Sequence, residues 1–160
     1  MELTKKIRKA VLIDAERREI SVVGIDAKHQ LDDMYAKIGC GTVDCVRSYL
    51  NFYWGCDDDI WIDDEGAFRM KQDEDKNDVQ YGFMVPQDRT GTAFLLLWNG
   101  LIMGFDPNAG ESLDTTLTDI QIEVLRHTII FVKLRNGMVL NAWLNGEDVT
   151  RMVLQGMAHA

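Results

Sequence analysis

Residues 9–23 read KAVLIDAERREISVV, and within them two β-prone runs flank a polar turn at residues 15–18. Short runs rich in Val and Ile that are separated by a polar turn are typical of a β-hairpin. Residues 129–144 repeat this form around Arg135-Asn136-Gly137, and residues 94–105 repeat it around Asn99-Gly100. Asn-Gly favours a tight hairpin turn because both residues tolerate positive φ. The sequence therefore predicts a sheet assembled from hairpins.

One of these stretches has two possible structures, and two further stretches follow the first hairpin in the chain. Residues 92–98 suit either a hairpin strand or a short buried helix, because periodicity cannot distinguish the two in so short an apolar run. Residues 60–63 and 67–70 flank Asp64-Glu65-Gly66, where a glycine with positive φ would complete a three-residue hairpin loop. Residues 71–79 are polar and are expected to form a mobile loop.

Three stretches have the apolar spacing of a helix. Apolar residues follow an i, i+3, i+4, i+7 pattern over residues 31–38, and Gly39 is suited to end that helix. Residues 117–126 begin after Thr and Asp side chains that favour helix capping. Residues 149–157 carry a third apolar stripe, which we expect Asn145 to cap. Together these patterns predict an α+β fold, a small antiparallel or mixed sheet built from hairpins with two or three packed helices.

The length of 160 residues and the hydrophobic content of 46% suit one globular domain. We expect residues 1–146 to form a single α+β domain and residues 147–160 to form a C-terminal helical appendix. No secretory signal is expected, and no apolar run approaches the roughly 20 residues that span a bilayer. Cys40, Cys45 and Cys56 are therefore expected to be free thiols in a reducing cytoplasm, away from any membrane.

The formal net charge of −9 argues against direct nucleic-acid binding, which depends on Lys and Arg at the phosphate backbone. The charge is also unevenly distributed. Residues 1–18 contain six Lys or Arg and three Asp or Glu, whereas residues 57–78 contain ten Asp or Glu and three Lys or Arg. Such a layout can steer a basic partner toward one side of the molecule.

Residues 51–66, NFYWGCDDDIWIDDEG, combine a cluster of aromatics with six acids. We expect the acids to be displayed around a hairpin, with exposed Trp and Tyr side chains acting as interface anchors inside a polar rim. Core packing is the alternative for each tryptophan. The predicted partner-binding residues are Tyr53, Trp54, Asp57, Asp58, Asp59, Trp61, Asp63, Asp64 and Glu65.

Signals for catalysis or metal binding are incomplete. Asp73, Asp75 and Asn77 have the spacing of the first three EF-hand ligands, but the glycine and the glutamate that complete such a loop are absent. Glu123 and His127 are one helical turn apart, which predicts a simple i, i+4 contact. The chain has no nucleophile elbow, phosphate-binding loop or zinc-protease motif. We therefore expect no catalytic residue, no metal and no cofactor.

Four segments, KAVLIDAERREISVV, LDDMYAKIGCGTVDCVRSY, DDIWIDDEGAF and VPQDRTGTAFLLLWNGLIMGFD, resemble the family known as domain of unknown function 3846. The best matches are the helix ending at Ile38-Gly39, the DDEG of residues 63–66, and the stretch marked by Gln87, Ala93, Ile102 and Gly104. The resemblance covers about the first 105 residues. It implies a small α+β accessory protein of a phage, plasmid or other mobile element, working in the cytoplasm of a bacterial host, with residues 92–98 helical. It supplies no catalytic residues, and the chain departs from the family pattern at residues 71–79 and after Ile129.

Two kinds of binding function and one enzymatic function follow. The first is a non-enzymatic, anti-defence type of protein that inhibits or redirects a host protein with a basic surface, in one variety by mimicking DNA. The alternative is a sponge that sequesters a small nucleotide-type immune signal, for which the candidate residues are Lys5, Lys6, Arg8, Lys9 and Trp54. The second alternative is an uncharacterised hydrolase. A homo-oligomer is compatible with each of these functions.

Overall fold

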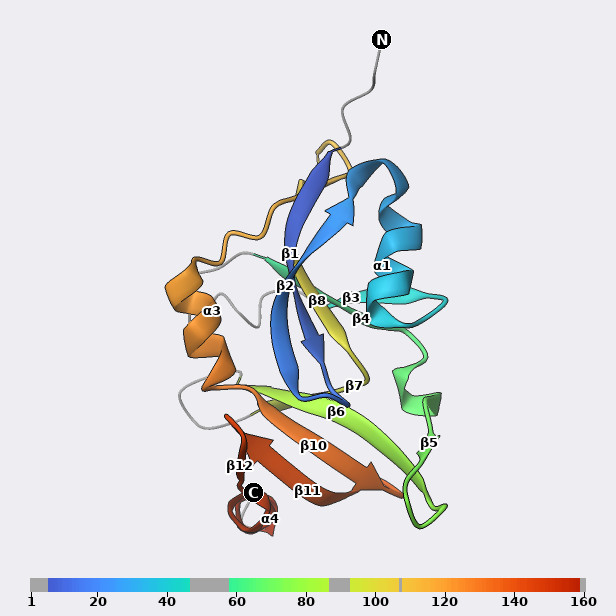
Figure 1. The fold of residues 1–160 in the computed structure, drawn as a ribbon, viewed down its shortest axis with the longest axis vertical. Coiled ribbons are helices and arrows are strands. Elements are labelled where there is room, and N and C mark those ends of the chain that lie inside the picture. The colour runs from blue at the N-terminus through green and yellow to red at the C-terminus, as the bar shows by residue number, and fades with distance from the viewer. Residues whose placement is uncertain (1–5, 47–57, 87–92, 107, 159–160) are drawn as a thin grey trace.

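The computed structural model describes residues 6–46, 58–86, 93–106 and 108–158 (Figure 1). Within them the chain forms two six-stranded antiparallel sheets and three α-helices, so the expected α+β fold is confirmed. The helices are α1 (Gln30–Ile38), α3 (Asp119–Arg126) and α4 (Thr150–Ala158), with short 3-10 turns η1 (Ala27–His29) and η2 (Gly66–Phe68). Among the described residues, no helix combines the length and the apolar character needed to cross a membrane.

The first sheet has the strand order β2-β1-β8-β4-β3, and β9 pairs with the end of β8. Its strands are β1 (Ile7–Asp14), β2 (Glu19–Asp26), β3 (Val43–Val46), β4 (Asp59–Asp63), β8 (Gly100–Asp106) and β9 (Glu111–Leu113). The second sheet has the order β12-β11-β10-β6-β5, and β7 pairs with β6. Its strands are β5 (Lys71–Gln72), β6 (Asp78–Pro86), β7 (Ala93–Leu97), β10 (Ile130–Arg135), β11 (Met138–Leu144) and β12 (Glu147–Asp148).

A shared apolar core joins the two sheets. Alternate residues of the first sheet, such as Val11 and Ile102, meet Phe83 and Phe131 of the second sheet and the buried face of α3. The opposite face of the first sheet packs under α1 through Met34, and the opposite face of the second sheet forms a core with Val153 of α4. Because side chains alternate across a strand, each sheet is apolar on both faces and each face is covered.

Two of the predicted hairpins are confirmed. β1 and β2 pair along their whole length, from Ile7 opposite Asp26 to Asp14 opposite Glu19. β10 and β11 pair around a two-residue turn in which Asn136 has φ 52° and Gly137 has φ 76°. Positive φ at both turn positions matches the right-handed twist of the flanking strands.

The hairpin predicted around Asn99-Gly100 is wrong in its pairing. Both runs are strands, so a helix at residues 92–98 is also wrong, but β7 pairs with β6 in the second sheet while β8 joins the first. The chain crosses between sheets here because Trp98 adopts φ 72°. The buried Asn99 amide then accepts a hydrogen bond from the Ala15 N–H (2.8 Å) and donates one to the Ile38 carbonyl (3.0 Å).

The hairpin predicted for residues 60–70 is also wrong. β4 pairs with β3 and β8, and the chain after it turns through η2. Gly66 does not have a left-handed φ there. It lies so close to β7 that a Cβ would sit 2.6 Å from the Leu97 carbonyl oxygen. The polar residues expected to form a mobile loop include β5, which forms a short hairpin with β6 through Lys71 opposite Val79.

The helix predictions are confirmed, with one exception in the capping. Gly39 ends α1 at φ 81° with its N–H bonded to the Tyr35 carbonyl, and Thr118 forms a capping box with Gln121 at the start of α3. The Asn145 cap predicted for the last helix is wrong. Asn145 lies in the turn between β11 and β12, and the Asp148 carboxylate accepts the Thr150 N–H instead (2.9 Å).

Candidate functional site

Two of the predicted partner-binding acids lie inside the protein. Asp58 is 2% exposed. Its carboxylate accepts hydrogen bonds from the Thr115 hydroxyl, from the Thr116 hydroxyl and from the Thr116 N–H (2.9 Å). These bonds tie the residue before β4 to the segment that leads into α3. Expecting this acid to be displayed was wrong, because a buried carboxylate needs hydrogen-bond donors and Thr115-Thr116 provide them.

Asp63 is likewise buried, at 3% exposure. Its carboxylate accepts the Glu65 N–H (2.9 Å) and the Arg69 Nε–H (2.6 Å), which closes the turn after β4. Donating this hydrogen bond to Asp63 raises the pKa of the Arg69 guanidinium, so Arg69 stays charged. The prediction that Asp63 is displayed was therefore wrong as well, since this side chain holds the turn in place.

The predicted aromatic anchor Trp61 packs in the core beneath α1 and meets Phe105 edge-on, with ring centroids 6.2 Å apart. Its neighbour Asp59 is half-buried in β4. Tyr53, Trp54 and Asp57 lie outside the described residues. Of the nine predicted partner-binding residues, only Asp64 and Glu65 are described and exposed.

Asp64 and Glu65 begin a segment of mostly exposed residues, 64–78, which we call the acidic connector. It leads from β4 of the first sheet to β6 of the second, and Figure 1 shows it along one side of the molecule. Its most exposed apolar side chains are Phe68, 82% exposed, and Met70, 55% exposed. Among the described residues, Phe68 is the most exposed of the large apolar side chains.

The connector also carries acids that form no ion pair with the described residues. Exposed carboxylates that pair with no cation in the described part of the chain are Asp64, Glu65, Glu74, Asp75 and Asp78. The basic residues Arg69 and Lys71 are already paired, with Asp63 and Glu16 respectively. Lys76 is the remaining cation of the connector, so these five acids, which we call the rim, outnumber its free cations.

Asp73 fastens the far end of the connector to the second sheet. Its carboxylate accepts the N–H groups of Asp75 (3.0 Å) and Asn77 (3.1 Å), and it lies 2.8 Å from Arg135 and 3.7 Å from Lys133. Partial desolvation opposes ionisation, but these hydrogen bonds and charges together hold the pKa of Asp73 below its usual range. The connector is thus held at both ends, by Asp63–Arg69 and by Asp73–Arg135.

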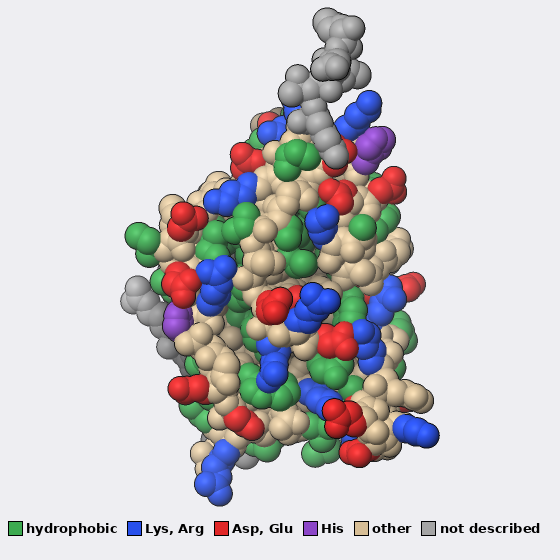
Figure 2. Space-filling model, viewed as in Figure 1, with side chains coloured by type: hydrophobic (Ala, Val, Ile, Leu, Met, Phe, Trp, Pro, Cys, Tyr) green, Lys and Arg blue, Asp and Glu red, His purple; other side chains and the backbone are tan. Residues whose placement is uncertain are grey.

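Charged side chains of both signs cover the face seen in Figure 2, with hydrophobic side chains between them. No uniform acidic field, as a DNA mimic would need, is visible on this face. In the connector, two of the three cations, Arg69 and Lys71, are already paired.

The structure describes three of the five residues in the alternative set. Lys6, Arg8 and Lys9 lie at the start of β1, where Lys9 reaches Asp119 (3.8 Å) and its N–H bonds to Asp114 (2.9 Å). Lys6 is exposed and Arg8 is half-buried, while Lys5 and Trp54 lie outside the described residues. A pocket lined by three arginines lies at the other end of the β1–β2 hairpin.

Groups with the potential for chemistry have structural partners. His127 contacts Glu123 (3.3 Å), which confirms the predicted i, i+4 contact, and a hydrogen bond from Arg126 lowers the pKa of Glu123. Cys40 and Cys45 are free thiols, and burial followed by the nearby Asp63 charge raises the pKa of Cys40. Among the described residues, no group of three or more His, Cys, Asp or Glu side chains is placed to hold a metal ion.

The chain matches no protein-family model, and searches of curated proteins and of solved structures gave no match. The resemblance to domain of unknown function 3846 therefore stays a prediction. Residues 67–70 were predicted to form a hairpin strand, and Phe68 was not singled out as a site residue. A signal was present, since a lone Phe stands between the acids of residues 63–65 and those of residues 73–75.

Proposed function

We propose that the chain is a non-enzymatic binding protein that docks a basic partner protein on the acidic connector and thereby blocks or redirects that partner. The observation that supports this most directly is the 82% exposure of Phe68 in a segment that also carries the unpaired rim acids. Aromatic side chains at the centre of a polar rim are the usual hot spots of protein interfaces.

The two parts of the connector would contribute in different ways. Burying an exposed phenylalanine side chain against a partner contributes about 1.5–3 kcal/mol, and Met70 adds to the same apolar centre. Unpaired carboxylates such as Asp64 and Glu65 raise the association rate of a basic partner and exclude acidic ones. Affinity therefore depends mainly on Phe68, and selectivity depends mainly on the rim.

The fixed ends of the connector favour binding without a large ordering cost. Asp63–Arg69 holds the turn before Phe68, and Asp73–Arg135 holds the hairpin after it. A segment that is already ordered loses little conformational entropy when it binds. The resemblance described above suggests a setting for this function, an accessory protein of a mobile element that acts on a bacterial host protein.

Site-specific photo-crosslinking tests the proposal. A benzophenone amino acid at position 68 should crosslink a discrete basic protein in bacterial cells. The matched control is the same amino acid at Ile120 of α3, which is 78% exposed and whose neighbouring acids Asp119 and Glu123 are both paired with cations. The proposal fails if position 68 gives no product, or if both positions give the same products.

A charge series tests the role of the rim. Asp64→Asn, Glu65→Gln and Asp75→Asn together should reduce the yield from position 68 by about tenfold, because the steering field is removed. The matched control neutralises the exposed acids Asp32, Glu111 and Glu147, which lie outside the connector. Equal loss in the two triple variants would show that net charge, and not the rim, drives capture.

A further inference from the structure

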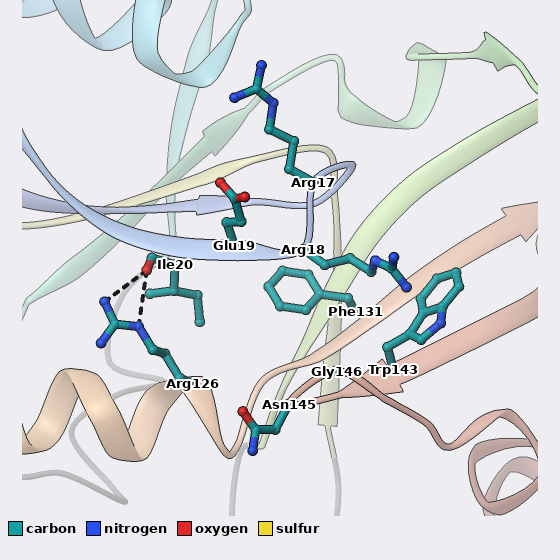
Figure 3. Close-up of a pocket in the computed structure, with 9 residues that line it drawn as sticks. All are labelled: Arg17, Arg18, Glu19, Ile20, Arg126, Phe131, Trp143, Asn145 and Gly146. Atoms are coloured by element: carbon teal, nitrogen blue, oxygen red, sulfur yellow. Dashed lines mark hydrogen bonds between the residues drawn. The ribbon is translucent and has the colours of Figure 1, made fainter.

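A cavity of about 450 Å³ lies between the β1–β2 turn, the end of α3 and the strands β10 and β11 (Figure 3). This volume is in the range of about 300–1,000 Å³ that is typical of small-molecule sites. Its apolar wall includes Ile20, Phe131 and Trp143, and its polar residues include Arg17, Arg18 and Arg126. Residues from both sheets and one helix thus meet at a single hollow.

The charge at this cavity is opposite to that of the whole chain. Three arginines line it against one acid, Glu19, although the net charge of the protein is −9. Arg126 is occupied, because its guanidinium donates to the Ile20 carbonyl (3.2 and 3.1 Å) and to Glu123 (2.8 Å). Among the described residues, no carboxylate pairs with Arg17 or Arg18. The cavity therefore keeps unpaired positive charge.

Arg18 is the arginine best placed to use that charge. Its guanidinium carbon lies 4.2 Å from the centroid of the Trp143 ring, whereas the Arg17 side chain points away from Trp143 in Figure 3. Arg18 also adopts φ 57°, a left-handed conformation that Gly or Asn would adopt with less strain. The turn thus places a guanidinium over an indole ring at a position where the backbone favours a different residue.

We propose that this cavity binds a small ligand of the nucleoside phosphate class. The Arg18 guanidinium would turn from the Trp143 ring to the phosphate, and the aromatic base would stack on the ring face that the guanidinium leaves. The phosphate oxygens would accept hydrogen bonds from the Arg18 guanidinium, whose forked donors suit phosphate. The residues involved are separate from the acidic connector, so nucleotide binding at this site can be tested independently of partner docking.

Isothermal calorimetry with AMP, GMP, CMP and UMP tests the proposal, with adenosine and inorganic phosphate as the two halves of a ligand. At least one nucleotide should bind in the micromolar range, and at least about tenfold tighter than either half alone, because ring and phosphate are both recognised. No binding by any nucleotide at millimolar concentration overturns the proposal. Equal binding of nucleoside and nucleotide, or of phosphate and nucleotide, overturns it too.

Arg18→Gly separates binding from folding. Glycine suits φ 57°, so the variant should melt at or above the wild-type temperature while its nucleotide affinity falls at least about tenfold. Lys76→Gly is the matched control, since Lys76 is another cation at positive φ (60°) in a turn away from the cavity. Unchanged affinity in Arg18→Gly, or equal loss in Lys76→Gly, contradicts the assigned role of Arg18.

Discussion

Arg69 Nε lies 2.6 Å from Asp63 Oδ2 across the turn that follows β4, and the two side chains differ sharply in burial. The Asp63 side chain is 0% exposed, whereas that of Arg69 is 39% exposed. The pair thus neutralises a carboxylate that water cannot reach while the guanidinium stays at the surface. A buried charge of this kind depends strongly on its partner. The exposed position of Phe68 follows from this closed turn.

Removing that partner should destabilise the fold. Arg69→Met is expected to lower the free energy of unfolding by about 2–3 kcal/mol, because the buried Asp63 carboxylate keeps only the Glu65 N–H. Urea denaturation measures the loss. Lys37→Met, which breaks the half-buried helical pair with Asp33 (3.4 Å), should cost less than about 1 kcal/mol and serves as the control. Equal losses of unfolding free energy in Arg69→Met and Lys37→Met would show that the buried Asp63–Arg69 pair stabilises the fold no more than the half-buried helical pair.

Acid should loosen the far end of the connector through Asp73. The folded protein holds the pKa of Asp73 below its ordinary value of 3.8, so the carboxylate stabilises the fold above about pH 4 and this stabilisation is lost as the pH falls through the folded pKa. Asp73→Asn should therefore melt lower than wild type at neutral pH. The gap between the two melting temperatures should narrow on acidification. Asp64→Asn, which disrupts no described ion pair, is the control, and a gap that stays constant with pH would refute the assignment.

The crossing between the two sheets should depend on Asn99. Asn99→Ala leaves the Ala15 N–H and the Ile38 carbonyl without their partner in a buried position, which should cost about 2–4 kcal/mol of unfolding free energy. Hydrogen exchange should also become faster at the Ala15 amide. Asn108→Ala removes an exposed asparagine and should be close to neutral. Slow exchange at Ala15 in the Asn99 variant would show that another group satisfies that amide.

Local patterns in the sequence were sufficient for the elements whose partners are close in the chain. The β1–β2 and β10–β11 hairpins, α1 and α3 are all specified by neighbouring residues, through turn chemistry, apolar periodicity and capping. The pairing of β4, β7 and β8 was not predictable in this way. β8 pairs with β1 and β4, which are distant from it in sequence, whereas β7 pairs back onto β6, and an Asn-Gly pair can serve a crossing as well as a hairpin.

The same limit applies to the candidate site. Exposure of Asp64 and Glu65 was anticipated correctly, because acids beside a glycine turn are usually solvated. The burial of Asp58 was not, since its threonine partners are 57 and 58 positions away in the chain. The arginine cavity was also missed. Its lining residues come from parts of the chain that only the fold brings together.

The order in which the chain visits the two sheets has a consequence for synthesis. Strands β1 to β4 belong to the first sheet and β5 to β7 to the second, and β8 then returns to lie between β1 and β4. During translation, β1 and β4 therefore leave the ribosome with open edges that only β8, at residues 100–106, can occupy. Such edges are prone to intermolecular association until they are paired. A nascent chain stalled before residue 100 should recruit chaperones, and one released after residue 106 should need them less.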